Sequence, residues 1–143
     1  MKKETPTDFP IHPHIADRWS PYWFDDKPVS SADLRSLLEA ARWSASSYNE
    51  QPWRLIVSTR DQGEPHEQMV QCLIEGNQTW AREAPVLMLG LTRRTFERNG
   101  DPNAACEHDL GLAAASLTLE ATSRGLFVHQ MSGILADKIQ HTY

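Results

Sequence analysis

Polar amides and hydroxyls are concentrated in residues 44–53, which read Ser-Ala-Ser-Ser-Tyr-Asn-Glu-Gln-Pro-Trp. The segment joins an amphipathic stretch to an apolar one, a position where Gly, Pro and Asp usually make the turn. Asn49 and Gln51 each carry a carbonyl acceptor and an amide with two donors. These groups suit a planar heterocycle with alternating N–H and C=O groups, such as the isoalloxazine ring of a flavin. The alternative is a polar loop that satisfies its own backbone, as Ser and Asn often do.

Two further places carry groups that could do chemistry. Arg18 and Ser20 form an Arg-x-Ser pair, and the planar guanidinium of Arg suits a phosphate or a ring carbonyl. The alternative there is a surface Arg beside a capping Ser. His108 and Asp109 are neighbours, but Cys106 lies two positions before His108 and so does not share its helical face. We therefore favour a structural role for His108 and Asp109 over acid–base catalysis.

Several other chemistries have no signature in this chain. The sequence shows no Ser/His/Asp order, no zinc-type spacing and no Gly-x-Gly-x-x-Gly fingerprint. We expect no metal site and no catalytic side chain. A nicotinamide nucleotide, if used, would visit a bound flavin transiently.

Composition sets the class of protein. The 143 residues fit one domain, 40% are hydrophobic, and the net charge of -5 argues against a nucleic-acid partner. Cys72 and Cys106 lack metal-type spacing and fit free core thiols in a reducing compartment. Neither a signal peptide nor an apolar stretch of membrane-spanning length is visible. We expect a cytoplasmic protein with no membrane partner.

Periodicity predicts strands alternating with helices, which indicates an α/β or α+β layered domain. Leu34, Leu37, Leu38 and Ala41 share one helical face, and Ser30 or Ser31 can cap that helix. Gly76 and Asn77 are expected to separate two helices. The sequence predicts helices over about 31–43, 67–75, 78–83 and 103–124, and strands over 53–58, 86–91 and 126–129.

The longest predicted helix, 103–124, is apolar or small nearly all round in its middle. Such a helix is buried or meets another subunit. Gly111 costs about 1 kcal/mol in a helix relative to Ala, so a close approach by another helix would justify it. Gly125 follows the helix and is expected to end it in the left-handed conformation.

Three blocks in this order resemble the nitroreductase family: Arg18-Trp19-Ser20, the segment Ser46-Ser47-Tyr48-Asn49-Glu50-Gln51-Pro52-Trp53, and Gln130-Met131-Ser132-Gly133. The resemblance runs from about Ile15 to Lys138. It implies cofactor-binding roles for Arg18, Trp19, Ser20, Tyr22, Ser46, Ser47, Asn49, Gln51, Asn77, Met131, Ser132 and Gly133. This chain departs from the family at Tyr22, where a second basic residue is typical, and at Ala45, where Pro is frequent.

Two of these assignments have alternatives. Asn77 resembles a family Asn near the pyrimidine edge of the flavin, and a helix-capping Asn would look the same in sequence. Met131-Ser132-Gly133 resembles a segment whose backbone lies along the flavin edge, where Gly permits close approach. A plain turn between a strand and a helix is the alternative.

The resemblance also implies an activity and an assembly. Family members are FMN-dependent oxidoreductases that take electrons from NAD(P)H and pass them to a nitroaromatic, a quinone or a similar acceptor. They fold as an α+β layered sheet with flanking helices and form intertwined homodimers with FMN at the subunit interface. We expect an extended arm over 1–14 and a nitroreductase-like FMN-binding domain over 15–143 that lacks the C-terminal portion. The alternative is a truncated homologue that binds flavin weakly and acts as a binding or structural module.

Overall fold

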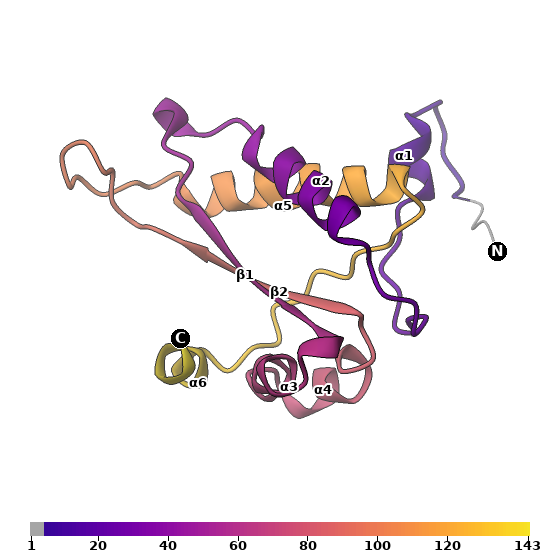
Figure 1. Cartoon of the computed structure of the whole chain (residues 1–143). Coiled ribbons are helices and arrows are strands. Elements are labelled where there is room, and N and C mark those ends of the chain that lie inside the picture. The colour runs from indigo at the N-terminus through magenta and orange to yellow at the C-terminus, as the bar shows by residue number, and fades with distance from the viewer. Residues whose placement is uncertain (1–4) are drawn as a thin grey trace. The chain divides into compact units, whose positions relative to one another are not determined.

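The computed structural model describes residues 5–143, and its elements follow one another along the chain as in Figure 1. The first four residues of the arm expected over 1–14 lie outside the described residues. Residues 5–12 form neither helix nor strand, and Pro13 already opens the first helix. The elements are α1 (Pro13–Asp17), α2 (Ser31–Arg42), η1 (Ser47–Asn49), β1 (Trp53–Thr59), η2 (Arg60–Gln62), α3 (Glu64–Gln71), α4 (Glu75–Ala81), β2 (Val86–Thr92), α5 (Cys106–Ser123) and α6 (Ala136–Thr142).

Strands β1 and β2 form a two-stranded antiparallel sheet. The N–H of Arg93 donates to the carbonyl of Pro52 at one end, and the N–H of Arg60 donates to the carbonyl of Pro85 at the other, at 3.0 and 2.9 Å. The start of one strand therefore faces the end of the other. With helices beside this sheet, the expected α+β class is confirmed.

The chain divides into two compact units. The first unit comprises residues up to Ser20, Ser30–Arg54 and Leu91–Val128. The second unit comprises Pro21–Val29, Leu55–Gly90 and His129–Tyr143. Each is described by itself below.

In the first unit, α2 packs against α5. Ser30 is the N-cap of α2, because its Oγ accepts the N–H of Asp33 at 3.0 Å. Leu37 and Ala41 turn inward and are buried, as the spacing predicts. The hydroxyl of Ser44, just past the helix, donates to Ser116 Oγ on α5 at 2.8 Å. This packing fixes the start of the polar segment 44–53 against the middle of α5.

In the second unit, six buried side chains on α3, α4 and β2 and near them form a hydrophobic core. They are Met69, Val70, Leu73, Ala81, Ala84 and Leu87. Phe24, Ile56, Trp80, Leu89 and Met131 pack against this core. Val70 is completely buried, so α3 is anchored through its last turn.

Two predicted features of the secondary structure were wrong, and one helix was missed. Leu126–His129 is not a strand: the N–H of Leu126 bonds back to the carbonyl of Ala121 and closes α5 after Gly125, whose φ of 70° is left-handed as expected. Gly76 and Asn77 do not break a helix. They lie in the first turn of α4, where backbone N–H groups need no intrahelical partner. Helix α6 was not predicted at all.

Within residues 5–143, the structure contains no helix long and apolar enough to cross a membrane. Cys72 and Cys106 are both buried and free, as expected.

Candidate flavin-binding site

The loop between α2 and β1 has an unusual backbone. Tyr48, Asn49 and Gln51 have φ values of 54°, 56° and 49°, and they are the non-glycine residues at positive φ in the described part of the chain. L-residues disfavour this region, and Asn tolerates it best. Each such residue costs on the order of 1–3 kcal/mol and persists only where the surroundings hold it. Three within four positions therefore indicate a loop kept in shape by its neighbours.

One neighbour that holds the loop is Asp109, in the first turn of α5. Its Oδ2 accepts the backbone N–H of Ser47 at 3.0 Å, and the residue is only 2% exposed. Its other oxygen faces Nδ1 of the exposed His108 at 3.4 Å. These contacts agree with the structural role favoured for His108 and Asp109. Asp109 plays that role by bonding to the loop of the candidate site.

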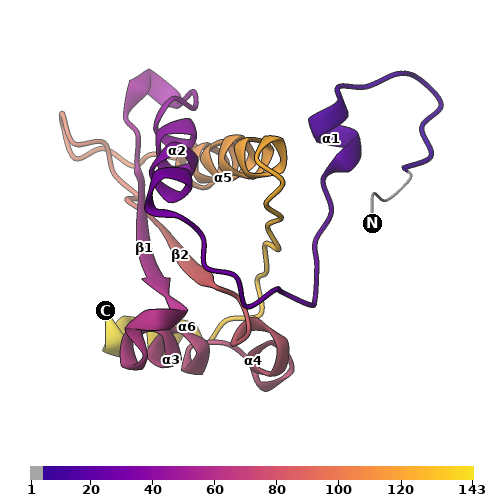
Figure 2. The same ribbon diagram turned by 45° about the vertical axis from the view of Figure 1, so that its right-hand side comes forward.

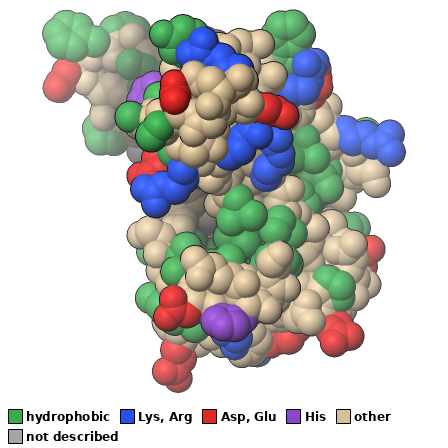
Figure 3. Space-filling model, turned by 90° about the vertical axis from the view of Figure 1, so that its left-hand side faces the viewer, with side chains coloured by type: hydrophobic (Ala, Val, Ile, Leu, Met, Phe, Trp, Pro, Cys, Tyr) green, Lys and Arg blue, Asp and Glu red, His purple; other side chains and the backbone are tan. Residues whose placement is uncertain are grey.

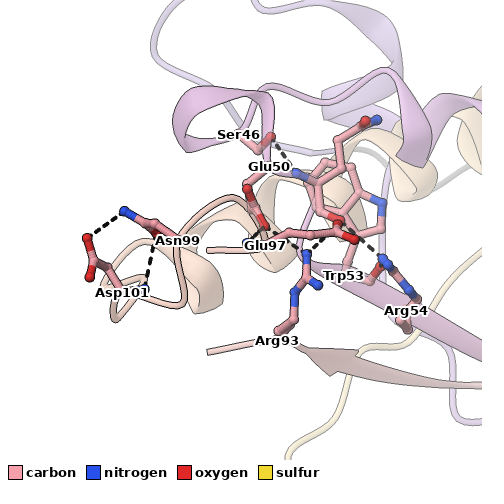
Figure 4. A network of polar contacts seen from close by, with 9 residues as sticks. Ser46, Glu50, Trp53, Arg54, Arg93, Glu97, Asn99 and Asp101 are labelled. Atoms are coloured by element: carbon pink, nitrogen blue, oxygen red, sulfur yellow. Dashed lines mark hydrogen bonds and ion pairs between the residues drawn. The ribbon is translucent and has the colours of Figure 1, made fainter. Parts of the chain in front are cut away.

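A second anchor lies at the other end of the loop, on Glu50 (Figure 4). Its carboxylate accepts Arg93 Nη2 at 2.8 Å and the backbone N–H of Glu97 at 2.6 Å, and its side chain is 8% exposed. Arg93 also bonds to the Glu97 carboxylate, and this hydrogen bond lowers the pKa of Glu97. The loop is therefore fastened to the segment that follows β2.

Two polar side chains of the loop make hydrogen bonds to nearby backbone groups. The hydroxyl oxygen of Ser46 accepts the N–H of Gln51 at 3.0 Å, and the side-chain amide of Gln51 donates to the carbonyl of Arg42 at 3.2 Å. Both side chains thus bond to nearby backbone, as in the self-satisfying alternative, and their contact with a cofactor stays a prediction. Asn49 is exposed, and within the described chain the Asn49 amide and the Ser47 hydroxyl make no hydrogen bond. These two groups remain available to a ligand.

The Arg18 block lies elsewhere in the first unit. Arg18 Nη1 faces Ser20 Oγ at 3.4 Å, and both residues are exposed. Between them Trp19 is half-buried and packs on Phe127, with ring centroids 5.7 Å apart. The block therefore sits beside the chain that leaves the C-terminal end of α5, where Figures 1 and 2 show α1.

The Arg18 block and the loop stand at opposite ends of one helix. The loop is bonded to the first turn of α5 through Asp109, whereas Trp19 packs on Phe127, past the last turn. Helix α5 has 18 residues, so the two ends are about 27 Å apart at 1.5 Å per residue. Within one chain, Arg18 and Ser20 are not brought together with Ser46, Ser47, Asn49 and Gln51.

The second unit brings together Asn77 and Gly133. Asn77 Nδ2 donates to the carbonyl of Gly133 at 3.2 Å, which also accepts the N–H of Ile74 at 3.1 Å. A Cβ built on Gly133 would meet Ile74 Cδ1 at 2.8 Å and would clash with the Asn77 amide. Glycine is therefore required here by the close approach of Ile74 and Asn77, and the expected approach to a flavin edge stays a prediction. The capping alternative for Asn77 is wrong, because Ile74 is the N-cap of α4.

The remaining predicted residues in this unit are placed differently. Met131 packs on the core, and Ser132 is exposed with its carbonyl accepting the N–H of Ile134 at 2.9 Å. Tyr22 is 58% exposed and lies edge-on to Trp80 and His129, with centroids 5.1 and 4.7 Å away. An aromatic ring thus stands at Tyr22, where the resemblance led us to expect a second basic residue.

The loop, the Arg-x-Ser pair and Gly133 belong to the three sequence blocks that resemble one family, and a comparison with known families decides the assignment. The model of the Nitroreductase family matches residues 15–142. The chain belongs to the nitroreductase family. Within the described residues, no group of three or more His, Cys, Asp or Glu side chains could hold a metal ion.

Known relatives agree with this nitroreductase assignment. A crystal structure described as an oxidoreductase containing FMN is 36% identical, with a TM-score of 0.89 over 96% of this chain and 70% of that one. The major NAD(P)H-flavin oxidoreductase of Aliivibrio fischeri is 47% identical over 36% of this chain and 24% of its own length. The nitrobenzene nitroreductase of Ectopseudomonas oleovorans is 39% identical over 49% of this chain and 30% of its own. The chain spans less than half of the length of these two curated relatives.

Proposed function

We propose that this chain binds FMN and passes electrons from NAD(P)H to a small acceptor such as a nitroaromatic or a quinone. The strained loop carries the proposal, because it presents an unpartnered Asn49 amide and Ser47 hydroxyl at the position where the family block lies. When bound, FMN supplies the electron transfer, and the protein supplies binding and orientation. This division fits a site to which we assign no catalytic side chain.

The residues of the chain fit the chemical groups of FMN. The guanidinium of Arg18 suits the phosphate or a ring carbonyl, since charged donors bind such oxygens strongly. The Asn49 amide can donate to a ring carbonyl and accept from a ring N–H. Gly133 stays a predicted contact of the cofactor, since the space that its Cβ would take is filled by Ile74 and Asn77. Cys72 and Cys106 are free thiols, which is typical of proteins in a reducing compartment such as the cytoplasm.

We further propose that each FMN is held between two copies of the chain in a homodimer. The Arg18 block and the Asn49 loop lie at opposite ends of α5, so one FMN does not reach both within one chain. The block of one copy and the loop of its partner can share a cofactor. Gly111, Ala115 and Leu119 form an exposed row at helical spacing along α5, which offers a contact surface for the partner.

Exposed apolar side chains support a partner copy. Phe9, Trp23 and Trp43 are 79%, 89% and 74% exposed. Figure 3 shows hydrophobic side chains at the surface beside charged ones. A partner copy would bury part of this exposed apolar surface, and burial of apolar surface favours association.

A direct test uses the purified protein. After desalting, we expect visible flavin absorbance, and anaerobic addition of NADH or NADPH should bleach it. Re-oxidation by a nitroaromatic or a quinone should restore the colour. A protein that stays colourless when supplied with FMN and never bleaches would contradict the proposal and favour a binding or structural module.

A further inference from the structure

We propose that Asp109 and Glu50 are positioning residues that hold the loop Ser46–Gln51 in its cofactor-binding shape before any cofactor is bound. This inference rests on the proposed function for its link to FMN. Its structural part concerns the first unit alone. The two carboxylates are called the loop anchors below.

The first anchor acts where the strained backbone begins. Asp109 is almost completely buried, and its Oδ2 accepts the N–H of Ser47, the residue just before Tyr48. A buried carboxylate is tolerated only where hydrogen bonds compensate it. Asp109 stands in the first turn of α5, so its position is fixed by that helix. Helix α5 thus holds the carboxylate of Asp109 in place as the hydrogen-bond acceptor for Ser47, at the start of the loop.

The second anchor acts inside the strained stretch. Glu50 has helical angles, φ -66° and ψ -29°, but it stands between Asn49 and Gln51, both at positive φ. Its buried carboxylate binds Arg93 and the N–H of Glu97. A side chain fixed at this point limits the backbone rotation of both neighbours. The strained residues are therefore held from α5 on one side and from the segment after β2 on the other.

Together, the anchors keep Asn49 in place while leaving its amide unbonded. Without an anchor, Tyr48 and Gln51 gain by relaxing to negative φ, because L-residues disfavour the left-handed region. Asn49 would then leave its position for most of the time. If the binding-ready loop falls to about a tenth of the population, the apparent Kd for FMN rises about tenfold. The anchors thus contribute to affinity by preorganisation and without touching the cofactor.

The test compares Asp109→Ala and Glu50→Ala with Asp109→Asn, whose side-chain oxygen can still accept the N–H of Ser47. Glu107→Ala is the matched control, since Glu107 lies in the same turn of α5 with its side chain 76% exposed. Amide hydrogen exchange of residues 46–51 is measured in the FMN-free protein, and FMN binding is measured by fluorescence titration. Far-UV circular dichroism confirms that each variant is folded.

We expect both Ala variants to speed exchange in the loop and to raise the Kd for FMN about tenfold. Asp109→Asn and Glu107→Ala should match the wild type in both measurements. Wild-type exchange and affinity in folded Asp109→Ala or Glu50→Ala would overturn the inference, as would an Asp109→Asn that behaves like Asp109→Ala. If Asp109→Ala does not fold, Glu50→Ala decides. A wild type that binds no FMN refutes the proposed function, and the exchange measurement still tests the anchors.

Discussion

Arg18→Ala should weaken FMN binding by about 10- to 150-fold, because a hydrogen bond to a charged group contributes roughly 1.5–3 kcal/mol. Asn49→Ala removes a neutral hydrogen bond worth about 1 kcal/mol and should weaken binding about fivefold. Arg18 is exposed and bonds only weakly to Ser20, so its removal leaves the fold intact. Fluorescence titration of the FMN-free proteins measures the FMN affinities of the wild type, Arg18→Ala and Asn49→Ala.

Arg94→Ala is the matched control for Arg18. The Arg94 side chain is 82% exposed and pairs only loosely with Glu107, at 3.7 Å. Its loss should leave FMN affinity at the wild-type value. Equal affinities for the wild type, Arg18→Ala and Asn49→Ala would refute the assignment of both residues to the site.

Gly111→Leu should dissociate the homodimer while the single chain remains folded. Gly111 faces open space within the described chain, since a Cβ built there meets nothing within 4 Å. Leu favours helix over Gly by about 0.8 kcal/mol, so the chain itself should not lose stability. At a close contact between two copies, the added side chain overfills the interface at a cost of about 1–3 kcal/mol.

Sedimentation over a range of concentrations measures this effect. We expect the dimer dissociation constant to rise by about tenfold or more, with an unchanged or higher melting temperature in dilute protein. Gly111→Ala, which adds a single methyl group, should have a much smaller effect. A dimer of wild-type affinity in Gly111→Leu would exclude this part of α5 from the interface.

Local chemistry made much of the first unit predictable. Ser30 caps α2 because its hydroxyl oxygen accepts the N–H of Asp33 three residues later, and Leu37 and Ala41 are buried because they share one face. The polar segment 44–53 was singled out by its residue types, and it contains the non-glycine residues at positive φ among residues 5–143. Helix capping and helical periodicity depend on residues three or four positions apart, so they could be predicted from the sequence.

The contacts that shape the candidate site could not be predicted from local patterns. Asp109 meets Ser47 across 62 positions, and Glu50 meets Arg93 across 43. No spacing rule connects residues so far apart. The four residues Leu126–His129 had the composition of a strand, but a strand also needs a neighbour to pair with, and Leu126 bonds back to α5 instead. Contacts between distant parts of the chain thus determine the shape of the loop, and the absence of a paired neighbour within residues 5–143 keeps Leu126–His129 from forming a strand.

The wide separation of Arg18 from Asn49 was likewise invisible in the sequence. Both belong to sequence blocks that resemble one family, and that resemblance implies that both contact the same cofactor. In the structure, the 18 residues of α5 keep them apart. The proposed site therefore needs a homodimer, because neither end of α5 in one chain has both the Arg18 guanidinium and the Asn49 amide.

Mixing the two site variants tests this requirement most directly. When Arg18→Ala and Asn49→Ala chains carry different affinity tags and are co-expressed, the heterodimer can be isolated with both tags. If FMN is shared between copies, one site of the heterodimer combines the intact Arg18 of one chain with the intact Asn49 of the other. The account predicts one FMN per heterodimer bound with wild-type affinity, although both variant homodimers bind weakly. A heterodimer without any wild-type site would contradict it and place Arg18 and Asn49 in separate sites or outside the FMN site.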